Sequence, residues 1–368
     1  MGIHYNRCTR RRSYRSRLVR ASLVIGLSVT HAHLASASTD TQWALRYLQA
    51  EKVWEITRGA RTEVAVVDTG VQPDTDTAVN LLSGADFSDS TGVSTGSGRL
   101  DKDEDGHGTG EASIIGGAGV RTLGLSPESS ILPVRATDGS SAGLTFGLAP
   151  AIEFAISHKA SVINLALGYE QADADIHRAV QDALNHDVVV VAAVGNDGTS
   201  QQYYPAAWPG VVGVGAIDSS GNVWSQSNTG ADVALVAPGV HILRDDNQGR
   251  VGYSDGTSEA TAYVSAAAAL VRSAHPGWSA AEVVAALEAT ADKPAAMRGA
   301  VRDDRYGAGI LDVLAAVRLA EPPVVGGAVA APVPRAGSGL GWWWLVGAGA
   351  VVGGVGVFFG ARRWVRRA

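Results

Sequence analysis

Several short apolar runs, rich in valine and isoleucine, lie in the middle of the chain and are too short to form helices. They are residues 62–67, 131–134, 162–165, 188–193 and 211–214. Apolar runs without alternating polar positions are typical of strands that are buried on both faces, as in a parallel sheet. Helix-like stretches follow several of these runs, at residues 144–158, 172–186 and 258–274. The alternation predicts an α/β fold, a parallel sheet with helices on both of its faces.

The first residues are rich in arginine and precede a short apolar run, residues 21–29, and the small-residue triplet Ala35-Ser36-Ala37. This is the three-part layout of a secretory signal peptide, so we expect residues 1–37 to be removed by cleavage after Ala37. The alternative is a buried N-terminal helix. Cys8 is the single cysteine and lies within this segment. The mature chain is therefore expected to contain no disulfide bond.

The other end of the chain predicts a membrane anchor. Residues 321–340 are rich in proline, glycine and alanine, which suits an extended linker. Residues 341–361 are uncharged and about as long as a membrane helix must be, and they begin with a tryptophan triplet that suits the membrane interface. Four arginines lie in the tail, residues 362–368, which should stay in the cytoplasm by the positive-inside rule. The alternative is a glycine-rich helix in a protein core.

Between these ends, residues 38–320 are expected to form one domain outside the cytoplasm. The formal net charge of −6 gives no sign of a nucleic-acid partner, and the 46% hydrophobic content suits a globular core. No cofactor motif is recognised. Asp101, Asp103 and Asp105 resemble the opening of a calcium-binding loop, but Ala112 stands where the closing glutamate belongs. We therefore interpret this segment as a solvated acidic loop and predict no metal site.

Three polar residues follow predicted strands or precede predicted helices, where the chemistry of a parallel α/β sheet is usually found. Asp68 ends the first strand and can orient a histidine. His107 has a glycine on each side, which exposes its imidazole as a general base requires, and Ser258 begins the alanine-rich helix. Each has an ordinary alternative, respectively a loop cap, an incidental histidine and a helix N-cap. Together they predict a catalytic triad.

An oxyanion that forms at Ser258 needs hydrogen-bond donors. The backbone N–H groups at the helix start offer one source. Asn196, in a Gly-Asn-Asp-Gly segment after a predicted strand, offers a neutral side-chain donor. Its alternative role is that of a turn residue.

The order Asp, His, Ser is that of subtilisin. Residues 42–317 resemble the subtilisin-like serine proteases in the segments Val67-Asp68-Thr69-Gly70, Gly106-His107-Gly108-Thr109 and Gly256-Thr257-Ser258. The resemblance implies that Asp68 orients the base, His107 accepts the Ser258 proton, Ser258 forms the acyl-enzyme and Asn196 donates to the oxyanion. It also implies that Ala166, Leu167 and Gly168 form part of a substrate-binding strand.

Within this family the chain is most similar to the mycosins, membrane-anchored proteases associated with type VII secretion. The features are the tryptophan-containing segment 42–59, the proline-rich tether with its membrane helix, and the run Tyr204-Pro205-Ala206-Ala207-Trp208-Pro209-Gly210. The resemblance implies exported polypeptides as substrates and a membrane secretion complex as a partner. Two alternatives remain open: a catalytically weak scaffold of such a complex, and a general surface-anchored degradative protease.

The chain also departs from the family pattern. Glu259 follows the nucleophile where a hydrophobic residue is usual, and Ala166 replaces a serine of the substrate strand. Glu259 either repels the oxyanion or points to solvent, where its charge is screened. Too few residues precede the first strand for a folded propeptide, so residues 43–56 are expected to form an amphipathic segment that packs on the catalytic domain.

Overall fold

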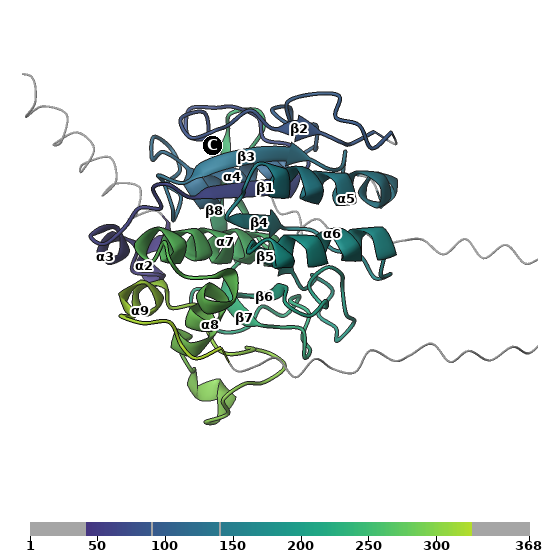
Figure 1. The fold of residues 1–368 in the computed structure, drawn as a ribbon. Coiled ribbons are helices and arrows are strands. Elements are labelled where there is room, and N and C mark those ends of the chain that lie inside the picture. The colour runs from purple at the N-terminus through teal and green to yellow at the C-terminus, as the bar shows by residue number, and fades with distance from the viewer. Residues whose placement is uncertain (1–41, 90, 140, 326–368) are drawn as a thin grey trace, which may run out of the picture.

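The computed structural model describes residues 42–89, 91–139 and 141–325 (Figure 1). The predicted signal peptide, the linker beyond residue 325, the membrane helix 341–361 and the basic tail lie outside these residues. Within the described part of the chain, no helix is both long enough and apolar enough to cross a membrane.

A seven-stranded sheet in the order β2-β3-β1-β4-β5-β6-β7 forms the centre of the fold, and every strand pair in it is parallel. Its strands are β1 (Glu63–Asp68), β2 (Ala85–Asp86), β3 (Ser130–Arg135), β4 (Val162–Leu165), β5 (Val189–Ala193), β6 (Val212–Ile217) and β7 (Leu235–Pro238). The five predicted strands are therefore confirmed. A separate antiparallel hairpin joins β8 (Ile242–Asp245) to β9 (Val251–Ser254).

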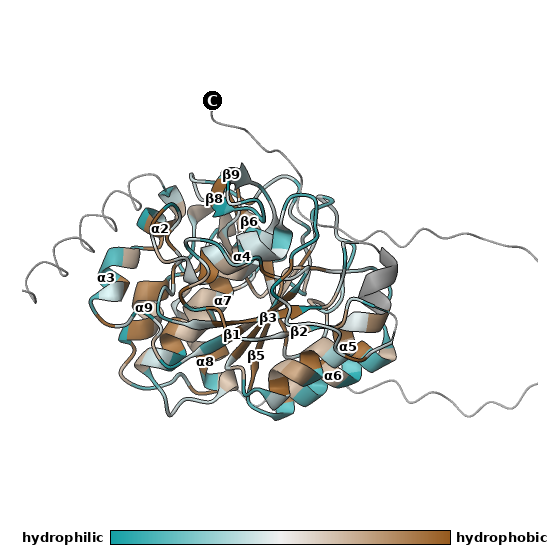
Figure 2. Ribbon diagram, turned by 90° about the horizontal axis from the view of Figure 1, so that it is seen from above, coloured by the Kyte–Doolittle hydropathy of each residue, from teal (hydrophilic) through white to brown (hydrophobic). Residues whose placement is uncertain are grey.

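Helices cover both faces of the sheet, as predicted (Figures 1 and 2). Along β1, Val64 and Val66 contribute to one hydrophobic cluster, whereas Ala65 and Val67 contribute to the other. The first cluster contains residues of α4 (His107–Gly116), α7 (Thr257–Ala274), α8 (Ala280–Thr290) and α9 (Val313–Arg318). The second contains residues of α5 (Ser141–Ser157) and α6 (Ala174–Asn185). Both faces are apolar, which explains the unbroken apolar runs in the sequence.

The helix α7 runs through the middle of the fold and packs against β4, β5, β6 and β7. Its many alanines allow close contact between the helix and the sheet. A buried polar contact also joins the helix to the sheet: the Ser265 hydroxyl donates to Oδ1 of Asn164 on β4 at 2.8 Å. The nucleophile candidate at its amino end is therefore on a rigid element.

The predicted amphipathic segment 43–56 packs on the domain, as expected, but forms two short helices. These are α2 (Trp43–Tyr47) and α3 (Ala50–Trp54), separated near Gln49, whose φ is 53°. Leu45 and Val53 are fully buried. The indole N–H of Trp54 donates to the Leu125 carbonyl at 2.8 Å.

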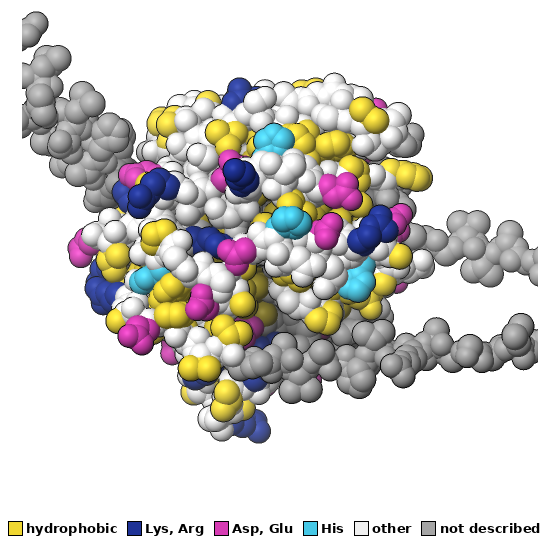
Figure 3. All heavy atoms as spheres, in the orientation of Figure 1, with side chains coloured by type: hydrophobic (Ala, Val, Ile, Leu, Met, Phe, Trp, Pro, Cys, Tyr) yellow, Lys and Arg dark blue, Asp and Glu magenta, His cyan; other side chains and the backbone are white. Residues whose placement is uncertain are grey.

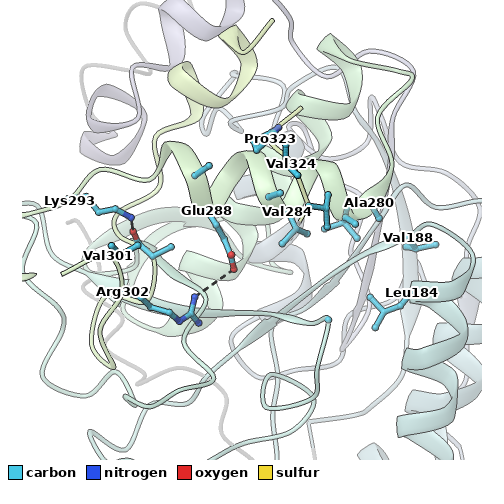
Figure 4. Close-up of a pocket in the computed structure, with 17 residues that line it drawn as sticks. Leu184, Val188, Ala280, Val284, Glu288, Lys293, Val301, Arg302, Pro323 and Val324 are labelled. Atoms are coloured by element: carbon cyan, nitrogen blue, oxygen red, sulfur yellow. Dashed lines mark hydrogen bonds and ion pairs between the residues drawn. The ribbon is translucent and has the colours of Figure 1, made fainter. Parts of the chain in front are cut away.

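Away from the carboxyl edge of the sheet, a cavity of about 770 Å³ lies between α6, α8 and the segment 323–325 (Figure 4). Its walls are mostly aliphatic, and the ion pair between Arg302 and Glu288, 3.8 Å, lies at one end. Val189, the first residue of β5, lines it, so the cavity opens at the amino end of that strand. On the face of the molecule in Figure 3, acidic and basic side chains are interspersed.

Candidate active site

The predicted site residues come together at the carboxyl edge of the sheet. Asp68 is the last residue of β1, the segment 166–168 directly follows β4, and Asn196 follows β5. Ser258 is the second residue of α7, among the backbone N–H groups at the helix's amino end. Because the strands are parallel, their carboxyl ends meet at one edge, as the sequence pattern required.

Asp68 and His107 form a buried pair. Oδ1 of Asp68 lies 2.8 Å from Nδ1 of His107 and also accepts the backbone N–H of Thr69 at 2.7 Å. Asp68 has no exposed surface, and His107 is 4% exposed. This contact fixes the orientation of the ring and places the proton of a neutral imidazole on Nδ1, which leaves Nε2 to act as the base.

Close packing of α4 against the end of β1 delivers His107 to Asp68. A Cβ atom at Gly108 would lie 2.2 Å from the Gly70 carbonyl oxygen, so only glycine permits this approach. The Gly108 N–H also donates to the Thr69 hydroxyl at 3.0 Å. The glycines around the histidine therefore serve helix packing as well as exposure of the imidazole.

The loop before α4 corrects one prediction. Asp101 and Asp103 are each 5% exposed, so the interpretation of a solvated acidic loop is wrong for these two residues, whereas Asp105 is half-buried. Asp103 accepts the His107 N–H at 3.2 Å, and Asp101 accepts both the N–H and the hydroxyl of Thr109, at 2.9 and 2.6 Å. The carboxylates satisfy the N–H groups that a helix start leaves unpaired, and so they hold the histidine in place.

The Ser258 hydroxyl donates to the Ala166 carbonyl at 3.0 Å. It must give up this bond for its proton to pass to His107. Ala166, Leu167 and Gly168 are buried directly after β4. The predicted substrate strand is thus adjacent to the predicted nucleophile.

Asn196 is oriented by contacts with Thr257. Its Oδ1 accepts the Thr257 N–H at 2.9 Å and the Thr257 hydroxyl at 2.8 Å. Its Nδ2 atom is buried and makes no hydrogen bond to any part of the chain that the structure describes. A buried donor of this kind, held beside the serine, suits a developing oxyanion.

The environment of His107 favours its protonated form. Burial alone lowers the pKa of the imidazole, but the charge of Asp68, the hydrogen bond to Asp68 and the charge of Glu111 together raise it to about 10. A base of this strength accepts a serine proton readily once it is itself neutral.

Sequence analysis missed a buried group of charged residues next to the site. Glu111 on α4 and Glu259 on α7 have no exposed surface, and Arg244 on β8 is 3% exposed. Glu259 therefore does not point to solvent, and that interpretation is wrong. Its Oε1 lies 3.6 Å from Nε of Arg244. The signal in the sequence was a glutamate in each of two segments made otherwise of small and apolar residues.

Comparison with known proteins agrees with this geometry. The sequence matches the model of the Subtilase family over residues 59–309. The chain belongs to the subtilase family. Subtilisin amylosacchariticus of Bacillus subtilis subsp. amylosacchariticus is 34% identical over 271 residues, which cover 71% of this chain and 66% of that relative. The aligned part is thus just under two thirds of the relative's length.

Solved structures similar to this subtilase include two mycosins. MycP1 from Mycobacterium smegmatis has a TM-score of 0.69 and 28% identity, covering 80% of this chain and 89% of its own. The MycP3 protease from the type VII (ESX-3) secretion system has a TM-score of 0.63 and 31% identity, covering 75% and 87%. The resemblance to subtilisin-like proteases, and among them to the mycosins, is confirmed, and it supports a serine endopeptidase.

Proposed function

We propose that this subtilase is a serine endopeptidase of the mycosin type, anchored in the cell membrane by residues 341–361 with its catalytic domain outside the cell. It hydrolyses peptide bonds of exported proteins in connection with a type VII secretion system. The observation that carries the activity is the buried 2.8 Å contact between Asp68 and His107, at the same sheet edge as Ser258.

In the proposed mechanism, Ser258 attacks the scissile carbonyl and gives its proton to Nε2 of His107. Asp68 stabilises the imidazolium that forms, and the imidazolium then protonates the leaving amine. Nδ2 of Asn196 and the backbone N–H groups at the start of α7 donate to the oxyanion. Water then attacks the acyl-enzyme and gives its proton to Nε2 of His107, which returns a proton to Ser258 as the acid product leaves. Residues 166–168 bind the substrate backbone next to the nucleophile.

The secretion assignment has a different support. MycP1 and MycP3 are described as proteases of type VII secretion systems, and the predicted tether and membrane helix would hold this chain at a membrane. A general surface protease would have the same active site but no such partner.

The activity is tested by labelling the full-length protein with a fluorophosphonate probe, which reacts rapidly with an activated serine. Labelling is expected at Ser258 and is expected to disappear in Ser258→Ala and His107→Ala. Ser265→Ala is the matched control. Ser265 lies on the same helix but its hydroxyl bonds to Asn164, so this variant should still be labelled at Ser258. Labelling that survives loss of Ser258 or His107 would refute the triad.

Anchoring and partnership need separate experiments. The full-length protein is expected to stay in the membrane fraction after alkaline extraction, and a C-terminal tag should be inaccessible from outside the cell. Purification of the tagged protein under mild detergent should recover a membrane secretion complex. Release by alkali would overturn the anchor, and recovery of the protease alone would favour the general surface protease.

A further inference from the structure

The catalytic histidine contacts a second carboxyl group, which the triad does not include. His107 is the first residue of α4, and Glu111 lies one helical turn further on. Oε1 of Glu111 is 4.0 Å from Nε2 of His107, while Oδ1 of Asp68 is 2.8 Å from Nδ1. Both carboxyl groups are fully buried. The imidazole therefore lies between two acids, one at each ring nitrogen.

Charged and titratable groups on every neighbouring element face this part of the site. They are Asp68 on β1, Asp101 and Asp103 in the preceding loop, Arg244 on β8, and Glu259 and Tyr263 on α7. The helices α4 and α7 pack against each other, and α4 packs against β8. Asp101 and Asp103 accept hydrogen bonds from N–H groups of α4. Asp68 and Glu111 lie next to the imidazole, and Glu259 lies next to the guanidinium.

Arg244 lies beside Glu259 and the amino end of α4, and its charge also acts on His107 and Glu111. Its Nη1 donates to the carbonyls of Gly106 and Asp105, at 3.2 and 3.4 Å, and its Nε lies 3.6 Å from Glu259. Gly110 makes room for it, since a Cβ there would lie 2.1 Å from Nη1. Neither oxygen of Glu111 accepts a hydrogen bond from the described residues. The imidazole of His107 lies within ion-pair distance of Glu111.

We propose that Glu111 is a positioning residue that stabilises the imidazolium form of His107 from its Nε2 edge, in addition to Asp68 at Nδ1. The proposal rests on the proposed protease function. When Ser258 gives up its proton, the positive ring then lies between two carboxyl groups, which strengthens the base. The same contact keeps the resting histidine protonated to higher pH. The acid limb of the pH–rate profile should therefore lie at higher pH than it would if Asp68 were the only carboxyl group beside the imidazole.

Opposing effects act on the charge of Glu111. Burial and the charge of Glu259 raise the pKa of Glu111 well above its ordinary value, whereas the charge of His107 acts to lower it. Glu111 and His107 consequently titrate as a coupled pair. In the singly protonated pair, burial of Glu111 favours two neutral groups, whereas attraction across 4.0 Å favours an ionised Glu111 with an imidazolium. That arrangement cannot accept the serine proton.

The test is the pH dependence of the second-order rate of fluorophosphonate labelling, measured on the full-length protein. This rate follows the ionisation of the base in the free enzyme. In Glu111→Gln, which keeps the shape of the side chain, the acid limb of the profile is expected to move to lower pH by about one unit or more. Glu111→Met removes the charge without leaving a buried amide, and it should move the limb the same way even if the glutamine variant folds poorly.

Glu63→Gln is the matched control. It is the same substitution, placed at the opposite end of the strand that carries Asp68. Its acid limb should coincide with that of the wild type. An acid limb that does not move in either Glu111 variant, or that moves to higher pH, overturns the role of Glu111. A wild-type protein that is not labelled at any pH would instead overturn the protease function, and this role with it.

Discussion

Replacing Arg244 by methionine is expected to destabilise the protein by about 3–5 kcal/mol, because Glu259 would keep its charge in a fully buried position. The distance of 3.6 Å between Nε and Oε1 corresponds to an attraction of about 5 kcal/mol at an effective dielectric constant of about 20. Arg244 also loses its hydrogen bonds to the carbonyls of Gly106 and Asp105.

Urea unfolding of the full-length protein measures this coupling in a double-mutant cycle. Ser258→Ala serves as the background, since it prevents self-digestion. Arg244→Met and Glu259→Leu are made singly and together. The double variant should lose less than the sum of the single variants by about 2 kcal/mol, since neither charge is then left buried alone.

The exposed pair of Arg178 and Asp175, 2.8 Å apart, is the control cycle, and we expect a coupling of about 0.5 kcal/mol or less there. Losses in the buried cycle that add to within about 0.5 kcal/mol would show that Arg244 and Glu259 do not interact, and would refute the reasoning.

The pair also changes the kinetic expectation for Glu259. With a guanidinium beside it, Glu259 presents little net charge to the oxyanion, so Glu259→Gln should not raise the turnover of a peptide ester.

Three further predictions concern neighbouring positions. Asn196→Ala should lower kcat for a peptide ester by about 10²–10³ with little change in KM, because the buried Nδ2 donor is lost. Gly110→Ala should destabilise the protein in urea by about 1–3 kcal/mol, because its Cβ displaces Arg244, whereas in an Arg244→Ala background the helix-forming preference of alanine should make it neutral or stabilising. Burial and the charge of Asp74 raise the pKa of Asp245 to about 7. The folded protein therefore favours the protonated carboxyl, and the stability that this preference contributes is present at pH 4 and lost as the pH rises through 7. The unfolding free energy of Asp245→Asn, relative to wild type, should accordingly increase from pH 4 to pH 8, and a constant difference would contradict this.

The parts of the fold that the sequence predicted depend on local patterns. The apolar run at residues 162–165 coincides with β4, and Asp68 ends β1, because a strand buried on both faces needs continuous apolar residues. Short β2 and the hairpin of β8 and β9 were not predicted. Two residues are too few for a pattern, and the hairpin strand β8 contains Arg244 and Asp245, which are buried through contacts with distant segments.

The triad could be proposed from the sequence because each member lies in a distinctive local sequence. The acidic loop was misjudged for the opposite reason. Asp101 and Asp103 look like solvent-exposed residues until α4 begins beside them and offers its unpaired N–H groups. The environment of Glu259 likewise could not be predicted from the local sequence. It depends on Arg244, which lies on the β8–β9 hairpin and contacts Glu259 only in the folded protein.

The charged cluster is best explained by the chemistry of His107 rather than by stability. Buried ion pairs contribute little compared with well-packed apolar residues of similar size, because desolvation offsets their attraction. A fold that needed stability alone at positions 111 and 259 would do as well with aliphatic side chains. The four positions instead depend on one another: Gly110 admits Arg244, Arg244 lies beside Glu259, and Glu111 lies within ion-pair distance of the imidazole. The physical result of that arrangement is an extra carboxyl group at the base of the proposed triad.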